Sequence, residues 1–317
     1  MAVVETPVAP AGSEGTTLTA KRTDVKGQAF KVVLISSLVI ALVILLTLIW
    51  DMWSEGRPIL TTRLWQFLTT GLASDPAIAG VWQGIKGTLM LGVIVALISF
   101  PMGIATAIYL EEYAGDTRFA RIVNINIRNL AGVPSIVYGL LGLAIFVQLL
   151  GENGRGGLTG GRTVISGGLT LALLVLPIVI ITAQEALRAV PAGIREGSLA
   201  LGATRFETTR HHVVPAAGPG ILTGTVLALA RAAGEAAPLL VVGAVTGVFF
   251  VGAQGIFEQI TSGRFTALPM VIFSWARLPA GQGWNANTGA AAIVLLALIL
   301  AMNGLAIYLR NRFERKW

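Results

Sequence analysis

The 317-residue chain is strongly apolar: 54% of its residues are hydrophobic, 12% are charged, and the mean hydropathy is +0.76. Soluble domains carry roughly 25% charged residues, so this composition excludes an ordinary soluble protein and predicts an integral membrane protein built of α-helices. The net charge of +7 does not indicate nucleic-acid binding, because the basic residues lie between apolar runs, where they determine membrane topology.

The chain opens with a polar, mixed stretch, residues 1–29, which predicts a disordered cytoplasmic tail. Residues 30–317 form the predicted transmembrane domain, because they contain runs of about 20 apolar residues, the length that crosses a bilayer. No small-residue cleavage site follows the first run, which is therefore expected to be a retained anchor. Six spans are predicted: Val32–Trp50, Gly87–Leu110, Asn129–Gly151, Thr163–Gln184, a fifth from Val213, and about Ala290–Leu309.

The segments between the spans have distinct predicted roles. Residues 51–83 are expected to form an external loop or an interfacial helix, and a short basic loop with Arg118, Arg121 and Arg128 precedes the third span. Thr266–Pro279 is expected to form a short helix on the external face.

The fifth region is ambiguous, because Val213–Ala230 and Ala236–Phe257 together exceed one span. With six spans and both termini inside, 15 of the 23 lysines and arginines fall in inside segments and 7 in outside segments. Splitting the region into two spans would place the basic C-terminus outside, against the positive-inside bias. The fifth helix is therefore expected to break into a partly buried external loop at glycines 243, 247, 252 and 255.

Residues 185–218 form the longest charged segment between two apolar runs. Pro191 suits the first turn of a helix in which Ile194, Ser198 and Leu201 share one face, and Gly202 is expected to stop it. Thr204 and Glu207 fit a capping box that starts a second short helix, and Pro215 and Pro219 are expected to end that helix. The segment is either a solvated connector or a docking element that fits a groove on another protein.

Arg231 and Glu235 lie inside the fifth apolar run. Arg231 follows Pro219 by 12 residues, about 18 Å of helix, which places it near the middle of the bilayer. Glu235 is four residues further and is expected on the same helix face. Two interpretations stay open: a salt bridge that only holds helices together, or an oxyanion site or gate in which the guanidinium holds phosphate.

Three polar residues of the third span, Asn129, Ser135 and Tyr138, either line a path or make ordinary hydrogen bonds between helices. There is no cysteine, and the adjacent His211 and His212 are a weak metal site at best, so neither a metal nor a cofactor is expected. No Walker A pattern occurs, so the chain is not expected to bind ATP.

The charged segment resembles the EAA loop of bacterial ABC-transporter permeases, through R-E-x-S-L-A-L-G-A-T-R followed by V-x-P-A-A. Gly197 stands where that family usually has alanine. The resemblance implies a coupling helix that sits in a cleft of an ATP-binding subunit. The implied coupling residues are Arg195, Glu196, Gly197, Ser198, Leu199, Ala200, Leu201, Gly202, Ala203 and Thr204.

Further motifs resemble phosphate-specific ABC permeases of the PstA type over residues 80–310. They include L-A-G-V-P-S-I-V-Y-G-L (Leu130–Leu140) and T-G-x-x-L-A-x-A-R-A-x-G-E-x-A-P-L, which contains Arg231 and Glu235. The resemblance implies an ABC importer type I permease fold and a role for Arg231 and Glu235 in phosphate passage. It also implies that the chain lies in the bacterial cytoplasmic membrane and has four partners: a second permease subunit, a dimer of ATP-binding subunits, an extracytoplasmic phosphate-binding protein, and phosphate itself.

Other functions remain open at this stage. A permease for sulfate or molybdate fits the same oxyanion chemistry. An ion-coupled secondary transporter with Arg231 and Glu235 as a proton relay is a second class, and a membrane scaffold without transport is a third.

Overall fold

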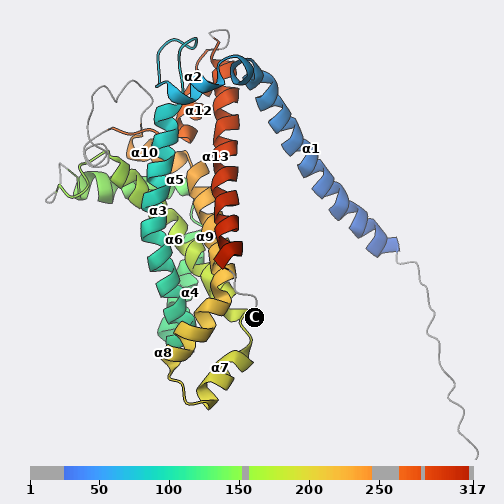
Figure 1. Ribbon diagram of the computed structural model, residues 1–317, viewed down its shortest axis with the longest axis vertical. Helices are drawn as coiled ribbons and strands as arrows, with labels where there is room; N and C mark the ends of the chain where they lie inside the picture. The colour runs from blue at the N-terminus through green and yellow to red at the C-terminus, as the bar shows by residue number, and fades with distance from the viewer. Residues whose placement is uncertain (1–24, 152–156, 245–263, 280–282, 314–317) are drawn as a thin grey trace, which may run out of the picture. The chain divides into compact units, whose positions relative to one another are not determined.

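The computed structural model describes residues 25–151, 157–244, 264–279 and 283–313 (Figure 1). Within these ranges every regular element is a helix. The chain divides into two compact units, Met1–Ile49 and Trp50–Trp317, which are described separately.

The first unit, within the described residues, is the first part of α1 (Val25–Thr62). The predicted span Val32–Trp50 lies inside this helix, but α1 starts seven residues earlier and continues 12 residues past Trp50. Residues 25–29 are therefore helical rather than part of a disordered tail, and residues 1–24 lie outside the described residues. The apolar side chains of the span are exposed within this chain, as expected for a helix surrounded by lipid.

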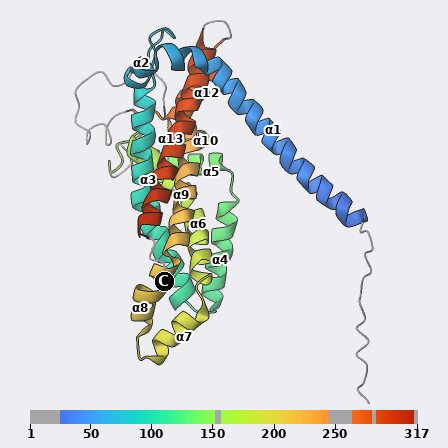
Figure 2. The same ribbon diagram turned by 45° about the vertical axis from the view of Figure 1, so that its right-hand side comes forward.

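The second unit is organised around α6 (Val164–Arg188), whose apolar window is 67% buried inside the protein. Two long helices pack along it: α3 (Trp82–Ile108) and α9 (Val214–Gly234). In both views α7 (Ala192–Ala200) and α8 (Arg205–Thr208) lie at the lower end of this unit, while α2 (Leu64–Thr69) and α12 (Leu268–Ala276) lie at the upper end (Figures 1 and 2).

Five helices of the described residues are long and apolar enough to span a membrane, and the number is six if one bent pair counts as a single span. The six predicted spans correspond to these segments. The last of them is α13 (Trp284–Phe313), which packs against α9 and α12. The helix expected within Thr266–Pro279 is confirmed as α12.

The bent pair corrects the predicted third span. The basic stretch expected as a loop is a helix, α4 (Arg118–Ala131), capped by Thr117. After α4 the chain changes direction by 102° and continues as α5 (Ser135–Gly142) and the π-helical turn η2 (Leu143–Leu149). Proline disfavours helical backbone at the residue before it, so Pro134 separates the two segments. The Tyr138 hydroxyl donates to the Leu130 carbonyl across the bend at 2.9 Å.

The fifth span also differs from the prediction at both ends. Pro215 and Pro219 do not interrupt it: α8, the π-helical turn η3 (Thr209–Val213) and α9 form one helical segment, Arg205–Gly234. Pro215 is the second residue of α9, just after the π-helical turn, and Pro219 lies inside α9.

The break comes at Glu235, whose backbone is extended, and not first at Gly243. After it, α10 (Ala237–Val242) ends at Gly243, which has a φ of +101°. Glycines 247, 252 and 255 lie outside the described residues.

The upper end is held by aromatic packing. Phe67, Trp275 and Trp284 stack with ring centroids 6.4 and 5.3 Å apart. Arg63 donates to the carbonyl of Pro76 at 2.6 Å and to Asn287 at 2.8 Å, so it ties the loop after α2 to α13. This end is thereby fixed to α12 and α13.

Candidate functional site

The predicted coupling loop has the local structure that its sequence specifies. The helix α7 follows Pro191 and ends at Ala200, with Leu201 as its C-cap, and Gly202 takes a φ of +90°. The Thr204 backbone N–H donates to Glu207 at 2.8 Å, and the Glu207 N–H donates to the Thr204 hydroxyl at 3.2 Å. The predicted glycine stop and capping box are both confirmed.

The expected common face of Ile194, Ser198 and Leu201 is wrong. The Ser198 side chain is buried, and its hydroxyl lies 3.0 Å from that of Thr208 in α8. Leu201 is 91% exposed, because the chain leaves the helix there. Leu199 and Phe206 are exposed as well, so the loop presents an apolar edge to its surroundings.

Most of the predicted coupling residues are accessible. Arg195 and Ala203 are half-buried and Ser198 is buried. The exposed members are Glu196, Gly197, Leu199, Ala200, Leu201, Gly202 and Thr204.

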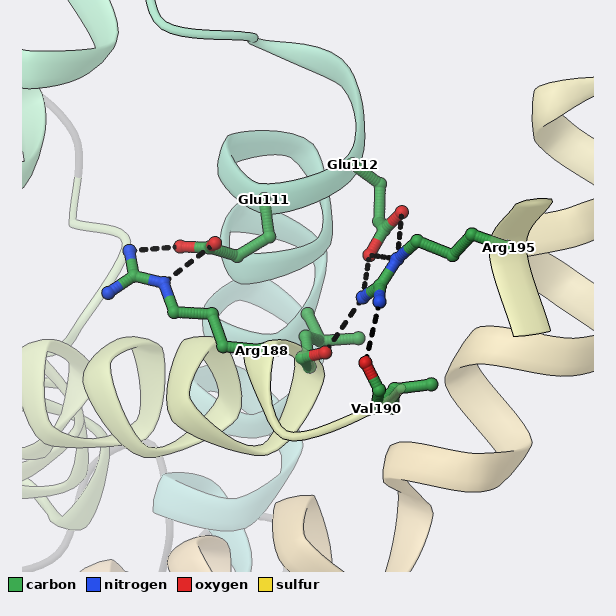
Figure 3. Close-up of polar contacts among 6 residues, drawn as sticks. Glu111, Glu112, Arg188, Val190 and Arg195 are labelled. Carbon is green, nitrogen blue, oxygen red and sulfur yellow. Dashed lines mark hydrogen bonds and ion pairs between the residues drawn. The ribbon is translucent and has the colours of Figure 1, made fainter. Parts of the chain in front are cut away.

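Arg195 connects the loop to two other elements (Figure 3). Its guanidinium donates to the Leu187 carbonyl in the last turn of α6 and to the Val190 carbonyl in the turn between α6 and α7, each at 2.8 Å. It also pairs with Glu112 at 2.8 Å. Glu112 belongs to the π-helical turn η1 (Tyr109–Tyr113), which continues α3.

A second pair lies beside the first. Arg188, at the end of α6, donates to Glu111 of η1 through two nitrogens, at 2.5 and 2.8 Å. Both glutamate side chains are largely buried, with 14% and 10% of Glu111 and Glu112 exposed. Sequence reasoning assigned no role to Glu111, Glu112 or Arg188. The available signals were two adjacent acidic residues at the end of an apolar span, and the motif A-L-R-A-V-P (Ala186–Pro191) around Arg188.

Arg231 and Glu235 lie at the other end of α9. The Arg231 Nε is 3.5 Å from a Glu235 carboxylate oxygen, and the side chains are 54% and 20% exposed. Arg231 shares an exposed face of α9 with Thr223 and Leu227, at steps of four residues. Because the pair joins neighbouring turns of one chain segment, it does not bridge two packed helices.

The three polar candidates of the third span lie in three different environments. Asn129 is exposed in the last turn of α4, and Ser135 is half-buried at the start of α5. Tyr138 is buried, and its hydroxyl donates a hydrogen bond to the Leu130 carbonyl. Its neighbour Gly139 packs so closely on α10 that a Cβ there would lie 2.8 Å from the Pro238 Cα. The third span therefore meets the segment that follows Glu235.

Among the described residues, no group of three or more histidines, aspartates or glutamates is placed to hold a metal ion. His211 and His212 are both exposed in η3.

Comparison with known proteins identifies similar chains. The family described as binding-protein-dependent transport system inner membrane component matches residues 99–317. The phosphate transport system permease protein PstA 1 of Mycobacterium tuberculosis (strain CDC 1551 / Oshkosh) is 31% identical over 309 residues, which cover 97% of this chain and 95% of that protein. PstA of Mycobacterium leprae (strain TN) is 32% identical over 284 residues, with coverages of 89% and 88%.

One solved structure is a bacterial alginate ABC transporter in complex with an alginate pentasaccharide-bound periplasmic protein. It matches with a TM-score of 0.62 at 13% identity, over 92% of this chain and 96% of that chain. At this identity the likeness concerns the fold alone.

Proposed function

Because the chain belongs to the family of binding-protein-dependent transport system inner membrane components, we propose that it is a permease subunit of an ATP-driven importer of inorganic phosphate. It is a multi-pass membrane protein with the helical fold of ABC importer permeases, and it is a transport component rather than an enzyme. In the proposal, a second permease completes the path, and both termini of this chain lie in the cytoplasm.

The observation that carries the proposal is the position of Arg231. Its guanidinium lies on an exposed face of α9 and not in the core of this chain. A cation in a membrane span is costly unless it faces a bundle interior or an aqueous path. A second permease packed on this face would enclose Arg231 between the two subunits, where it could bind an oxyanion.

Glu235 supports the same reading. It directly follows the last residue of α9, where the backbone becomes extended, and its carboxylate lies 3.5 Å from the Arg231 guanidinium. When no anion is bound, this carboxylate neutralises the guanidinium. When phosphate binds, the guanidinium can exchange the 3.5 Å contact with Glu235 for shorter hydrogen bonds to phosphate oxygens.

ATP coupling is assigned to the loop at the opposite end of the same helix. In the proposal, the apolar edge of Leu199, Leu201 and Phe206 enters a groove of an ATP-binding subunit. The helical segment Arg205–Gly234 joins this edge to Arg231 over 26 residues, about 39 Å at 1.5 Å per residue. A movement of the loop can therefore reach Arg231 through one element.

The test is phosphate uptake by the complete complex in vesicles, with its binding protein and ATP. Charge-assisted hydrogen bonds contribute about 1.5–3 kcal/mol, so Arg231→Gln should reduce uptake roughly ten- to hundredfold while the complex still assembles. The control is Arg121→Gln, which removes a pair with Asp116 that is exposed on both sides.

Three outcomes would contradict the proposal. Uptake driven by a proton gradient without ATP would indicate a secondary transporter. Uptake of sulfate or molybdate in preference to phosphate would assign another oxyanion. Full uptake by Arg231→Gln would remove Arg231 from the path.

A further inference from the structure

We infer that Glu111 and Glu112 are positioning residues for coupling: with Arg188 and Arg195 they form a joint that makes the coupling loop, α3 and α6 move together. The inference rests on the proposed function, because it assigns the route by which a movement of the loop enters the membrane domain.

The geometry of Arg195 is the first support. Arg195 lies in α7, yet its guanidinium contacts Glu112 of η1, the Leu187 carbonyl in the last turn of α6, and the Val190 carbonyl in the turn between α6 and α7. A cation at these carbonyls also suits the negative end of the α6 dipole. Arg195 therefore cannot shift with α7 unless both partners follow or the hydrogen bonds break.

The second pair closes the joint. Arg188 and Glu111 link the end of α6 to η1 through two parallel hydrogen bonds, at 2.8 and 2.5 Å. Bidentate pairs of this kind fix orientation as well as distance. With this pair in place, η1 and the end of α6 form one body, and Arg195 fastens α7 to both parts of it.

A buried apolar cluster lies next to the joint. Leu110 and Leu187 precede Glu111 and Arg188 in sequence, and both belong to one buried cluster that also contains Val190 and Val213. The charged pairs therefore lie at the edge of a packed core, where solvent screening is weaker than at a free surface. The two carboxylates, 14% and 10% exposed, differ in this from Asp116 of the Arg121–Asp116 pair, which is 88% exposed, whereas half of the Arg188 side chain is exposed.

The form of η1 is the third support. The turn Tyr109–Tyr113 is π-helical, and both glutamates lie within it. A π-turn inserts a residue into a helix and changes the direction of the side chains around it, and such turns occur frequently at functional sites. Here Glu111 reaches α6 and Glu112 reaches α7 from consecutive positions.

The measurement is the number of phosphate ions taken up per ATP hydrolysed by the reconstituted complex. We expect Glu112→Gln to leave the complex assembled and ATP hydrolysis nearly unchanged, because the residue lies outside the ATP-binding subunit. The phosphate-to-ATP ratio should fall about fivefold or more, the lower end of usual coupling factors. Asp116→Asn, which removes an exposed carboxylate between η1 and α4, should leave the ratio unchanged.

Charge reversal separates positioning from simple stabilisation. Glu111→Arg should lower the ratio, and the double variant Glu111→Arg/Arg188→Glu should restore it, because the exchange forms an opposite-charge pair again between η1 and the end of α6 (Figure 3). The same exchange at Glu112 and Arg195 should restore little, since a glutamate cannot donate to the two carbonyls. If the complex that carries Glu112→Gln does not assemble, the charge exchange between Glu111 and Arg188 alone tests the inferred joint.

The failures of the two ideas are distinguishable. A wild-type complex without ATP-driven phosphate uptake would overturn the proposed function. A wild-type complex that transports, together with an unchanged phosphate-to-ATP ratio in Glu112→Gln and Glu111→Arg, would overturn only the joint. A lower melting temperature at an unchanged ratio would show a purely structural role and also count against it.

Discussion

Gly197 and Gly202 lie five residues apart in the predicted coupling loop and have different backbone requirements. Gly197 is inside α7, and Gly202 follows it with a φ of +90°. A Cβ built at either position meets nothing within 4 Å. Space is therefore available at both, and only the backbone of Gly202 requires glycine.

This contrast predicts opposite effects of alanine. Gly197→Ala should stabilise α7 by roughly 0.5–1 kcal/mol, because glycine is the poorer helix former. Gly202→Ala should cost about 1–2 kcal/mol, because an L-residue is strained in the left-handed region. Hydrogen exchange of backbone amides in 192–208 measures this local opening, which should slow in the first variant and quicken in the second. Equal rates in the two variants would contradict the assignment.

The loop was predictable at this scale because its determinants are local. Gly202, Thr204 and Glu207 act on their own neighbours, so their spacing alone specifies the turn and the cap. Glu111 and Glu112 were not assigned because their partners lie 77 and 83 residues away. A sequence shows which charges are present but not which of them meet after folding.

The third span bends at Pro134, because proline disfavours helical backbone at the residue before it. A charge-free window predicted a single span from Asn129 to Gly151, yet the chain turns by 102° between α4 and α5. The three arginines of the expected loop fall in α4, with apolar residues between them at helical spacing. Hydropathy counts residues along the chain and cannot register a change of direction.

The bend gives Tyr138 a structural role that can be tested. Tyr138→Phe removes only the hydroxyl that donates to the Leu130 carbonyl. The expected loss is about 1 kcal/mol, seen as a lower unfolding temperature of the purified complex, with little change in the phosphate concentration for half-maximal uptake. A large change in that concentration, without loss of stability, would instead place the hydroxyl in the path.

At the scale of the molecule, the two ends of the second unit differ in how they are held. The upper end is fixed by the aromatic cluster of Phe67, Trp275 and Trp284. The lower end is held by the glutamate–arginine pairs at the rim of its own apolar cluster. Charged pairs can exchange partners at lower cost than a close-packed aromatic core can rearrange. This difference suits a protein that receives movement at one end and resists it at the other.

The membrane fold itself was largely readable from composition and spacing, because bilayer thickness fixes span length. What could not be read was the face that each helix presents. Arg231 is the clearest case. Its depth was predicted by counting from Pro219 as the start of the span, but the helical segment starts at Arg205, and the exposure of Arg231 depends on how α9 packs against α6 and α13. The same exposed face carries Leu227, which is 61% exposed.

The absence of cysteine allows this face to be mapped directly, since any introduced thiol is the only one in the chain. If α9 borders an aqueous path in the complex, Leu227→Cys should react with a small water-soluble methanethiosulfonate, because thiolates form only where water reaches them. Ala228→Cys, buried in the adjacent position, should stay unmodified.

Leu38→Cys provides the control for exposure to lipid. Leu38 and Leu227 are similarly exposed in this chain, at 70% and 61%. Leu38, however, lies in the first apolar span, where lipid hydrocarbon is expected around it. If exposure in this chain were sufficient, both thiols would react. If the aqueous path borders only α9, the reagent should modify Leu227→Cys and leave Leu38→Cys unmodified. Saturating phosphate should then slow the reaction at Leu227→Cys, because Arg231 lies one turn away on the same face. Lack of reaction at Leu227→Cys would mean that this face meets lipid or a dry interface, and Arg231 would then have to act without an aqueous path.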